Sequence, residues 1–315
     1  MKDFSGKYAV ITGGGTGMGR ELAIQLTAEG CNVAMCDVSV ENMAKTKELC
    51  VKEAPQGTRV ATFKADVSLE KQMTDWAEAV KKELDTDHIH LLINNAGIGG
   101  GGSFVAGDRA QWDKTFNVCF YGVINGCRAF LPMLMKAREG YIVNTSSVNG
   151  FWASLGPGRP HTAYSAAKFG VKGFTEALQE DLKMNAPHIK CAVVMPGHIG
   201  TEIVANSRKV LSGSDKVDVV QARKMMESMG MDTKPLDDTQ IAQAVEMQAI
   251  AFRDNAPTSA AQAATIILDG VRSEKWRILV GKDAEYLDEQ VRKAPETAYT
   301  PKFYEDLTKS TQCGI

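Results

Sequence analysis

A tyrosine and a lysine four positions apart are the residues of this sequence best suited to proton transfer. Tyr164 and Lys168 lie in the segment 162–184, whose pattern predicts a helix, and residues at this spacing share one helix face. A lysine ammonium beside a tyrosine lowers the pKa of the phenol, because the cation favours phenolate. Such a tyrosine can accept or donate a proton. The spacing is equally typical of a packed tyrosine ring beside a solvated lysine ammonium. The pair alone therefore does not distinguish a catalytic site from ordinary packing.

A glycine-rich loop between a strand and a helix is the second feature with recognisable chemistry. Residues 7–12 form a short apolar run typical of a buried strand, and residues 20–29 follow a helical pattern. Glycines between them allow backbone N–H groups to approach a pyrophosphate, and the helix N-terminus adds a favourable dipole. The arrangement predicts a turn that binds the phosphates of a dinucleotide.

The elements that position these residues alternate between strand and helix. The alternation predicts an α/β fold, a Rossmann-type doubly wound parallel sheet of about seven strands flanked by helices, in a single domain over 1–315. Ligands of such sheets bind at the carboxyl ends of the strands. The expected strands are 7–12, 32–36, 59–64, 90–93, 141–145, 190–195 and 277–280.

Three segments depart from this alternation. A long helix is expected from Asp108 to about Lys136, with Pro132 bending or ending it. Residues 199–257 lack clear strands, and we expect residues 201–258 to be a helical excursion that acts as a substrate lid. Residues 284–315 form a polar, helix-compatible C-terminal extension.

Composition excludes several classes of function. The chain has 315 residues, 44% of them hydrophobic and 23% charged, and its net charge of -2 favours neither nucleic acid nor an anionic membrane as partner. No apolar run approaches the length of a membrane span, and the N-terminus leads into a strand without a signal peptide. Seven scattered cysteines without a C-x-x-C pair indicate reduced thiols in a cytoplasmic protein. His88 and His90 lack a third ligand nearby, so no metal site is expected.

Several motifs in order make the sequence resemble the short-chain dehydrogenase/reductase family, in its ordinary single-domain branch, over residues 4–280. The stretch from Thr12 to Gly19 resembles the cofactor loop of the family, and Asp66-Val67 its adenine-binding pair. Asn94-Asn95-Ala96-Gly97 is similar to the motif that stabilises the central sheet beside the cofactor. Pro196-Gly197-x-x-x-Thr201 resembles the segment against the nicotinamide.

The resemblance also implies four catalytic residues, Asn117, Ser147, Tyr164 and Lys168. Tyr164 would be the acid/base, Lys168 would hold the nicotinamide ribose, and Ser147 would donate to the substrate oxygen. Asn117 would hold a water that connects Lys168 to solvent. Ser147 stands 17 positions before Tyr164, where about a dozen is usual in the family, so Ser146 is the alternative.

The expected coenzyme is NAD. Asp37 ends the second strand, where a carboxylate can accept hydrogen bonds from the adenosine ribose and repel a 2′-phosphate. Thr16 and Val38, where the family often places a basic residue for NADP, are uncharged, and Arg20 is expected to point to solvent. Asp37 could instead only shape a strand-end turn. The expected cofactor-binding residues are Gly13, Gly15, Thr16, Gly17, Met18, Gly19, Asp37, Val38, Asp66, Val67, Asn95, Ala96, Gly97, Tyr164, Lys168, Pro196, Gly197, Ile199 and Thr201.

The expected function is transfer of a hydride between NAD and a secondary alcohol or the matching ketone. Phe151, Trp152, His161 and His198 flank the expected cleft, and the methionines between 225 and 231 suit an adaptable apolar surface. They favour a bulky apolar substrate, aromatic, alicyclic or steroid-like, unless the lid merely packs on the core. The alternatives are a regulator or a redox-neutral enzyme that binds NAD. The resemblance also implies a homodimer or homotetramer packed on the helices that begin at Asp108 and Thr162.

Overall fold

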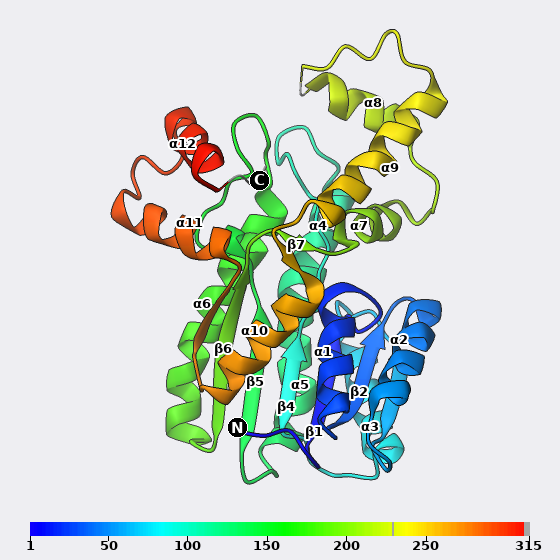
Figure 1. The fold of residues 1–315 in the computed structure, drawn as a ribbon, viewed down its shortest axis with the longest axis vertical. Helices are drawn as coiled ribbons and strands as arrows, with labels where there is room; N and C mark the ends of the chain where they lie inside the picture. Colours follow the sequence, from blue (N-terminus) through cyan, green and yellow to red (C-terminus); the bar gives the residue numbers. More distant parts are fainter. Residues whose placement is uncertain (229, 312–315) are drawn as a thin grey trace.

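The computed structural model describes residues 1–228 and 230–311 and centres on one parallel seven-stranded sheet (Figure 1). The strand order is β3-β2-β1-β4-β5-β6-β9, so the chain winds outward in both directions from β1 and β4. This is the Rossmann-type doubly wound fold that the alternation predicted. The strands are β1 Tyr8–Thr12, β2 Asn32–Asp37, β3 Val60–Lys64, β4 Leu91–Asn94, β5 Gly140–Thr145, β6 Ile189–Pro196 and β9 Arg277–Val280.

Helices cover both faces of the sheet and bury it. Packing on one face are α1 Gly17–Ala28, α2 Val40–Glu53 and α10 Ala260–Arg272, and on the other α3 Glu70–Glu83, α5 Gly122–Leu134 and α6 Thr162–Asn185. Every residue of β4 and β5 is buried, which explains their nearly continuous apolar runs. Two buried polar exceptions, Asn94 and Asn144, are linked to each other, because the Asn94 amide donates to Asn144 Oδ1 over 2.8 Å.

The long helix after β4 is interrupted in an unexpected place. It begins as α4 Arg109–Phe116, passes through a π-helical segment Asn117–Tyr121, and continues as α5 through Pro132 to Leu134. The irregularity therefore precedes Pro132, which lies inside α5. Such π-helical insertions widen one turn and frequently occur at functional sites.

The excursion after β6 contains short strands that the sequence did not indicate. Ile199–Gly200 (β7) pairs in parallel with Thr258–Ser259 (β8), so the prediction of a purely helical excursion is wrong at its two ends. Between them lie α7 Ile203–Ser212, α8 Val219–Ser228 and α9 Asp238–Asp254, which extend beyond the carboxyl edge of the sheet in Figure 1.

The C-terminal extension forms α11 Lys282–Lys293 and α12 Pro301–Thr311. Both helices pack around a small hydrophobic cluster that is separate from the two cores of the sheet and includes Val148 and Trp152. In the described part of the chain, no helix combines the length and the apolar character needed to cross a membrane.

Candidate active site

Ser147, Tyr164 and Lys168 come together at the carboxyl end of β5. The Ser147 hydroxyl lies beside the Tyr164 phenol, where it favours the phenolate form. Lys168 Nζ lies 5.4 Å from the centroid of the Tyr164 ring and donates to the carbonyl of Thr145 over 2.8 Å. Strand β5 delivers the serine, and the first turns of α6 present the tyrosine and lysine on one face.

The two candidate serines have different partners. Ser146 Oγ donates to the backbone carbonyl of Lys168 over 2.7 Å, so this hydroxyl ties β5 to α6. The Ser147 hydroxyl lies beside the Tyr164 phenol and accepts from the backbone N–H of Asn149 over 3.1 Å. The arrangement favours Ser147 as the residue that contacts a substrate oxygen.

Burial dominates the electrostatics of the pair. It raises the pKa of the Tyr164 phenol above its usual value, an effect that the nearby Cys119 increases and the neighbouring Ser147 hydroxyl partly offsets. Burial also lowers the pKa of Lys168. The expected lowering of the phenol pKa by Lys168 is therefore outweighed in the protein itself.

Asn117 does not join this group. Its side chain is exposed at the start of the π-helical segment, whereas Cys119 is 0% exposed. A Cβ built on Gly97 would lie 3.5 Å from Lys168 Nζ and 3.9 Å from Cys119 Sγ, so the amine and the thiol border the same space. The assignment of Asn117 to the catalytic group is thus corrected, and Cys119 is the side chain of this helix that faces Lys168.

The sequence contained a signal for this placement. Thr115, Val118, Cys119 and Gly122 follow the helical period of the buried stripe, and Asn117 lies outside it. The Cys119 thiol donates to the carbonyl of Ile98 over 3.1 Å, and burial raises the pKa of the thiol. Cys119 is therefore a neutral group beside a buried amine.

The glycine loop has the close approaches that a pyrophosphate site needs. Gly13 and Gly17 have φ values of 69° and 55°, in the left-handed region that favours glycine. A Cβ on Gly19 would lie 2.0 Å from the carbonyl oxygen of Gly13, so α1 begins in direct contact with the loop. Thr16 is the N-cap residue of α1, and Met18 packs partly buried against the core below. The cradle fits a dinucleotide phosphate at a helix N-terminus.

Asp37 stands at the end of β2 beside this loop. Its two carboxylate oxygens accept from the backbone N–H groups of Gly15 (3.0 Å) and Ser39 (2.9 Å). Val38, the next residue, is exposed. Arg20 differs from expectation: its guanidinium donates to the carbonyl of Gly15 over 2.6 Å and to Thr46 Oγ1 over 3.1 Å rather than pointing to solvent.

The two motifs at the ends of β3 and β4 hold backbone in place. The N–H groups of Asn95 and Ala96 donate to Thr12 Oγ1 over 2.9 and 3.0 Å, which ties the end of β4 to β1. The Asp66 N–H donates to Gln72 Oε1, and the carbonyl of Val67 accepts from the Asn125 amide. These contacts keep both loops at the carboxyl edge of the sheet, next to the glycine cradle.

The segment after β6 reaches back to the glycine loop. Pro196 is the last residue of β6, and Ile199 is buried in β7. Thr201 Cγ2 would be 3.0 Å from a Cβ on Gly17. From α7, the Asn206 amide donates to Thr16 Oγ1 over 2.9 Å, and Ser207 Oγ accepts from the Gly99 N–H over 2.8 Å. Helix α7 thus connects the glycine loop to the loop that follows β4.

The residues expected to contact substrate have other partners. Trp152 is 1% exposed and packs against the C-terminal extension, and Phe151 packs in the same cluster. Nε2 of His198 is hydrogen-bonded to the carbonyl of Phe252 over 2.7 Å. The expectation that these three side chains line the cleft is corrected. Phe151 and Trp152 pack in the cluster with the C-terminal extension, and His198 is hydrogen-bonded to α9.

His161 alone of this set stays beside the reaction centre. Its ring stacks on that of Tyr164 with centroids 4.7 Å apart. Burial lowers the pKa of this imidazole to about 4, and its buried Nδ1 has no hydrogen-bond partner among the described residues. A neutral imidazole against the tyrosine is compatible with a substrate contact.

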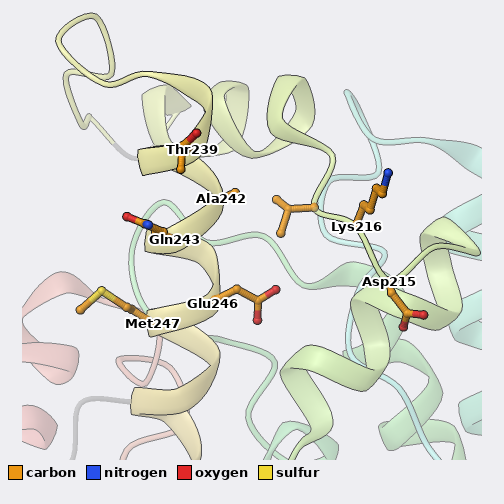
Figure 2. Close-up of a pocket in the computed structure, with 8 residues that line it drawn as sticks. Asp215, Lys216, Thr239, Ala242, Gln243, Glu246 and Met247 are labelled. Atoms are coloured by element: carbon orange, nitrogen blue, oxygen red, sulfur yellow. The ribbon is translucent and has the colours of Figure 1, made fainter.

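Figure 2 shows a pocket that lies apart from these residues. It has a volume of about 550 Å³ between the segment 215–217 and α9, and none of the expected catalytic or cofactor residues lines it. Of the methionines proposed for the lid, Met225 and Met231 are exposed, and Met229 lies outside the described residues. Within residues 1–228 and 230–311, no three His, Cys, Asp or Glu side chains are grouped to hold a metal ion.

Comparison with known proteins identifies the family. The short chain dehydrogenase family profile matches residues 7–211, and the chain belongs to this family. The putative oxidoreductase SadH of Mycobacterium tuberculosis is 37% identical over 216 residues, which cover 69% of this chain and 75% of that protein. Levodione reductase of Leifsonia aquatica is 35% identical over 212 residues, covering 66% and 75% of the two chains.

A solved structure extends the similarity to nearly the whole chain. A short chain dehydrogenase/reductase from Burkholderia phymatum in complex with NAD has a TM-score of 0.76 and 26% identity, covering 96% of this chain and 98% of that one. The chain is therefore an oxidoreductase of the short-chain dehydrogenase/reductase family.

Proposed function

We propose that the protein is an NAD-dependent oxidoreductase that transfers a hydride between the nicotinamide and a secondary alcohol or the matching ketone. The observation that carries the proposal is the grouping of Ser147, Tyr164 and Lys168 at the sheet edge that also bears the glycine cradle. The bound coenzyme would supply or accept the hydride.

The residues of this chain would then move the proton. Ser147 would donate a hydrogen bond to the substrate oxygen and fix it beside Tyr164. In ketone reduction, Tyr164 would donate its hydroxyl proton to that oxygen; the raised pKa of the phenol keeps the proton available. Lys168 would contact the nicotinamide ribose, and its charge would offset the phenolate that remains.

NAD is the proposed coenzyme because of Asp37. Its carboxylate lies at the carboxyl end of β2, within 3.0 Å of the Gly15 N–H, where an adenosine ribose would meet it. Arg20, the nearest cation in sequence, is held by Gly15 and Thr46. A 2′-phosphate would therefore meet a negative charge there.

We propose a bulky, apolar substrate for the same site. The similar protein levodione reductase is named for the reduction of levodione. In this chain, the stacked ring of His161 offers a flat apolar surface beside Tyr164. The free, buried state of the described cysteines supports the proposed cytoplasmic location.

The proposed assembly is a homodimer or homotetramer that packs on the long helices α4–α5 and α6. Exposed Tyr121 and Phe169 on these helices favour such packing. Light scattering after size exclusion would give the mass; a monomer at all concentrations would contradict this assembly.

A regulatory or redox-neutral NAD-binding protein is the second candidate, because an exposed Asn117 leaves the expected catalytic set incomplete. A screen of apolar secondary alcohols with NAD, and of ketones with NADH, separates the candidates by absorbance of the reduced nicotinamide. Turnover that disappears in Tyr164→Phe would establish the oxidoreductase. Coenzyme binding without turnover of any substrate would favour the second candidate.

A further inference from the structure

The loop between Ser147 and Tyr164 packs away from the sheet and onto the C-terminal extension. Val148, directly after the serine, and Trp152 are buried in one hydrophobic cluster with residues of the extension. The members from the extension are Ala284, Leu287, Ala298 and Leu307. The long spacing between Ser147 and Tyr164 therefore has a structural counterpart, since the added loop residues contact the added C-terminal helices.

Directional contacts reinforce this packing. Trp152 Nε1 donates to the carbonyl of Ala298 over 2.6 Å in a buried setting. The Ala153 N–H donates to the hydroxyl of Tyr299 over 3.1 Å. A Cβ on Gly156 would lie 2.6 Å from Cζ of Tyr304, so the extension also covers the far end of the loop.

The same extension holds the loop on the other side of the reaction centre. Asp283, in the first turn of α11, is buried, and its Oδ2 accepts from the N–H of His198 over 2.6 Å. A Cβ on Gly197 would lie 2.1 Å from this oxygen, so only glycine permits the approach. The segment Pro196–Thr201, proposed to contact the nicotinamide, is thereby fixed to α11.

We propose that residues 282–311 form a brace that holds both loops flanking Tyr164, with Trp152, Tyr299 and Asp283 as its positioning residues. The inference rests on the proposed oxidoreductase function for its catalytic consequence. Loops that order only on substrate binding consume binding free energy, and small displacements of positioned groups reduce rate. The brace would order the serine loop before substrate binds.

The test compares two phenylalanine substitutions within the extension. Tyr299→Phe removes the hydroxyl that accepts from Ala153. Tyr286→Phe removes a hydroxyl from α11 whose ring packs in the same cluster, and in the described chain this hydroxyl has no bond to the loop. We expect Tyr299→Phe to speed hydrogen exchange of residues 148–160 and to raise KM for the ketone about three- to tenfold, a loss typical of one hydrogen bond. Its kcat and its Kd for NADH should stay near those of Tyr286→Phe.

A third variant tests the other loop. Asp283→Ala should speed exchange of residues 197–201 and leave that of 148–160 as in the unmodified protein. Equal exchange and equal KM in Tyr299→Phe and Tyr286→Phe would overturn the brace, as would unchanged exchange of 197–201 in Asp283→Ala. If the unmodified protein turned over no substrate while the exchange differences held, the proposed function would fail and the brace would stand as a structural device.

Discussion

Tyr164 lies in surroundings that keep its hydroxyl protonated. The ring is partly buried against the core, its hydroxyl lies beside Ser147, and Lys168 Nζ is 5.4 Å from the ring centroid. A further positive charge near the phenol would lower its pKa, and the oxidised nicotinamide carries such a charge. The direction of proton transfer would thus depend on which coenzyme form is bound.

Replacement of this hydroxyl tests the acid/base role. Tyr164→Phe should lower kcat by about 10²- to 10⁴-fold, the usual contribution of such a group, with little change in the Kd for NADH. Steady-state kinetics and fluorescence titration measure the two quantities. Ser147→Ala should reduce kcat more than Ser146→Ala, whose lost hydroxyl ties β5 to α6. The opposite order would assign the substrate contact to Ser146.

Alanine substitutions of Asn117 and Cys119 test which of the two residues lies at the reaction centre. Asn117→Ala should keep kcat within about twofold, as for an exposed residue away from special contacts. Cys119→Ala opens a space bordered by Lys168 and the carbonyl of Ile98, which a water can enter. Water there would ease the burial of Tyr164 and lower the pKa of its phenol.

We therefore expect the acid limb of the pH–rate profile for alcohol oxidation to move to lower pH in Cys119→Ala. The profile of Asn117→Ala should overlay that of the unmodified protein. A large loss of kcat in Asn117→Ala, with a normal profile in Cys119→Ala, would restore the original assignment.

Asp37 is the residue that we propose sets the coenzyme preference. With the carboxylate beside the ribose, kcat/KM should be at least about tenfold higher with NAD than with NADP, equivalent to roughly 1.4 kcal/mol. Asp37→Ala combined with Val38→Arg should narrow or invert that ratio, because Val38 is exposed and can carry a cation toward the phosphate. Equal use of both coenzymes by the unmodified protein would show that Asp37 only stabilises the turn at the end of β2.

Motif chemistry predicted Ser147, Tyr164 and Lys168, since their order along the chain follows from the strand and helix that carry them. It could not place Asn117, because its orientation depends on the π-helical segment and on the packing of Cys119. Trp152 was likewise beyond sequence reasoning, because its partner Ala298 lies 146 residues away.

Among the elements, helix α7 contacts the loop proposed to bind the coenzyme phosphates. Asn206 donates to Thr16 in the glycine loop, and Ser207 accepts from Gly99 in the loop after β4. Asn206→Ala removes the bond to Thr16, worth about 0.5–1.5 kcal/mol, so NADH should dissociate roughly two- to tenfold faster. Stopped-flow fluorescence measures this rate. Lys209→Ala, at an exposed position of the same helix, is the control, and equal rates in both variants would show that the Asn206–Thr16 bond does not slow coenzyme release.

The seven sheet strands could be predicted because buried parallel strands are short apolar runs between turns. Strands β7 and β8 could not, since a strand of two residues shows no periodic pattern and their pairing joins positions 59 apart in the sequence, such as Ile199 and Thr258. The π-helical segment has no composition of its own, and Pro132 attracted the prediction of a bend instead.

Two partly buried histidines, His90 and His161, should make the stability of the whole molecule depend on pH. Burial lowers the pKa of His90 and of His161 to about 4, from an ordinary value of 6.5. A lowered pKa in the folded state means that the unfolded chain binds the proton first. Stability should therefore be full above about pH 6.5 and fall as the pH drops toward 4.

Thermal unfolding between pH 7.5 and 4.5 checks this expectation. The double variant His90→Gln and His161→Phe should lose less of its melting temperature over this range than the unmodified protein. His90→Gln keeps an acceptor for the Tyr8 N–H, and His161→Phe keeps the stack on Tyr164. Parallel curves for the two proteins would place the acid sensitivity in other groups.

The pairing of β7 with β8 joins the two ends of the excursion at one place. The chain leaves the sheet region at Ile199 and returns at Thr258, and these two residues are direct partners. The residues between Ile199 and Thr258 therefore form a segment whose two ends are held together. Lengthening such a segment raises the free energy of closing it by only about 0.6 kcal/mol for each doubling of its length. The excursion can therefore change in length while the seven strands of the main sheet keep their register.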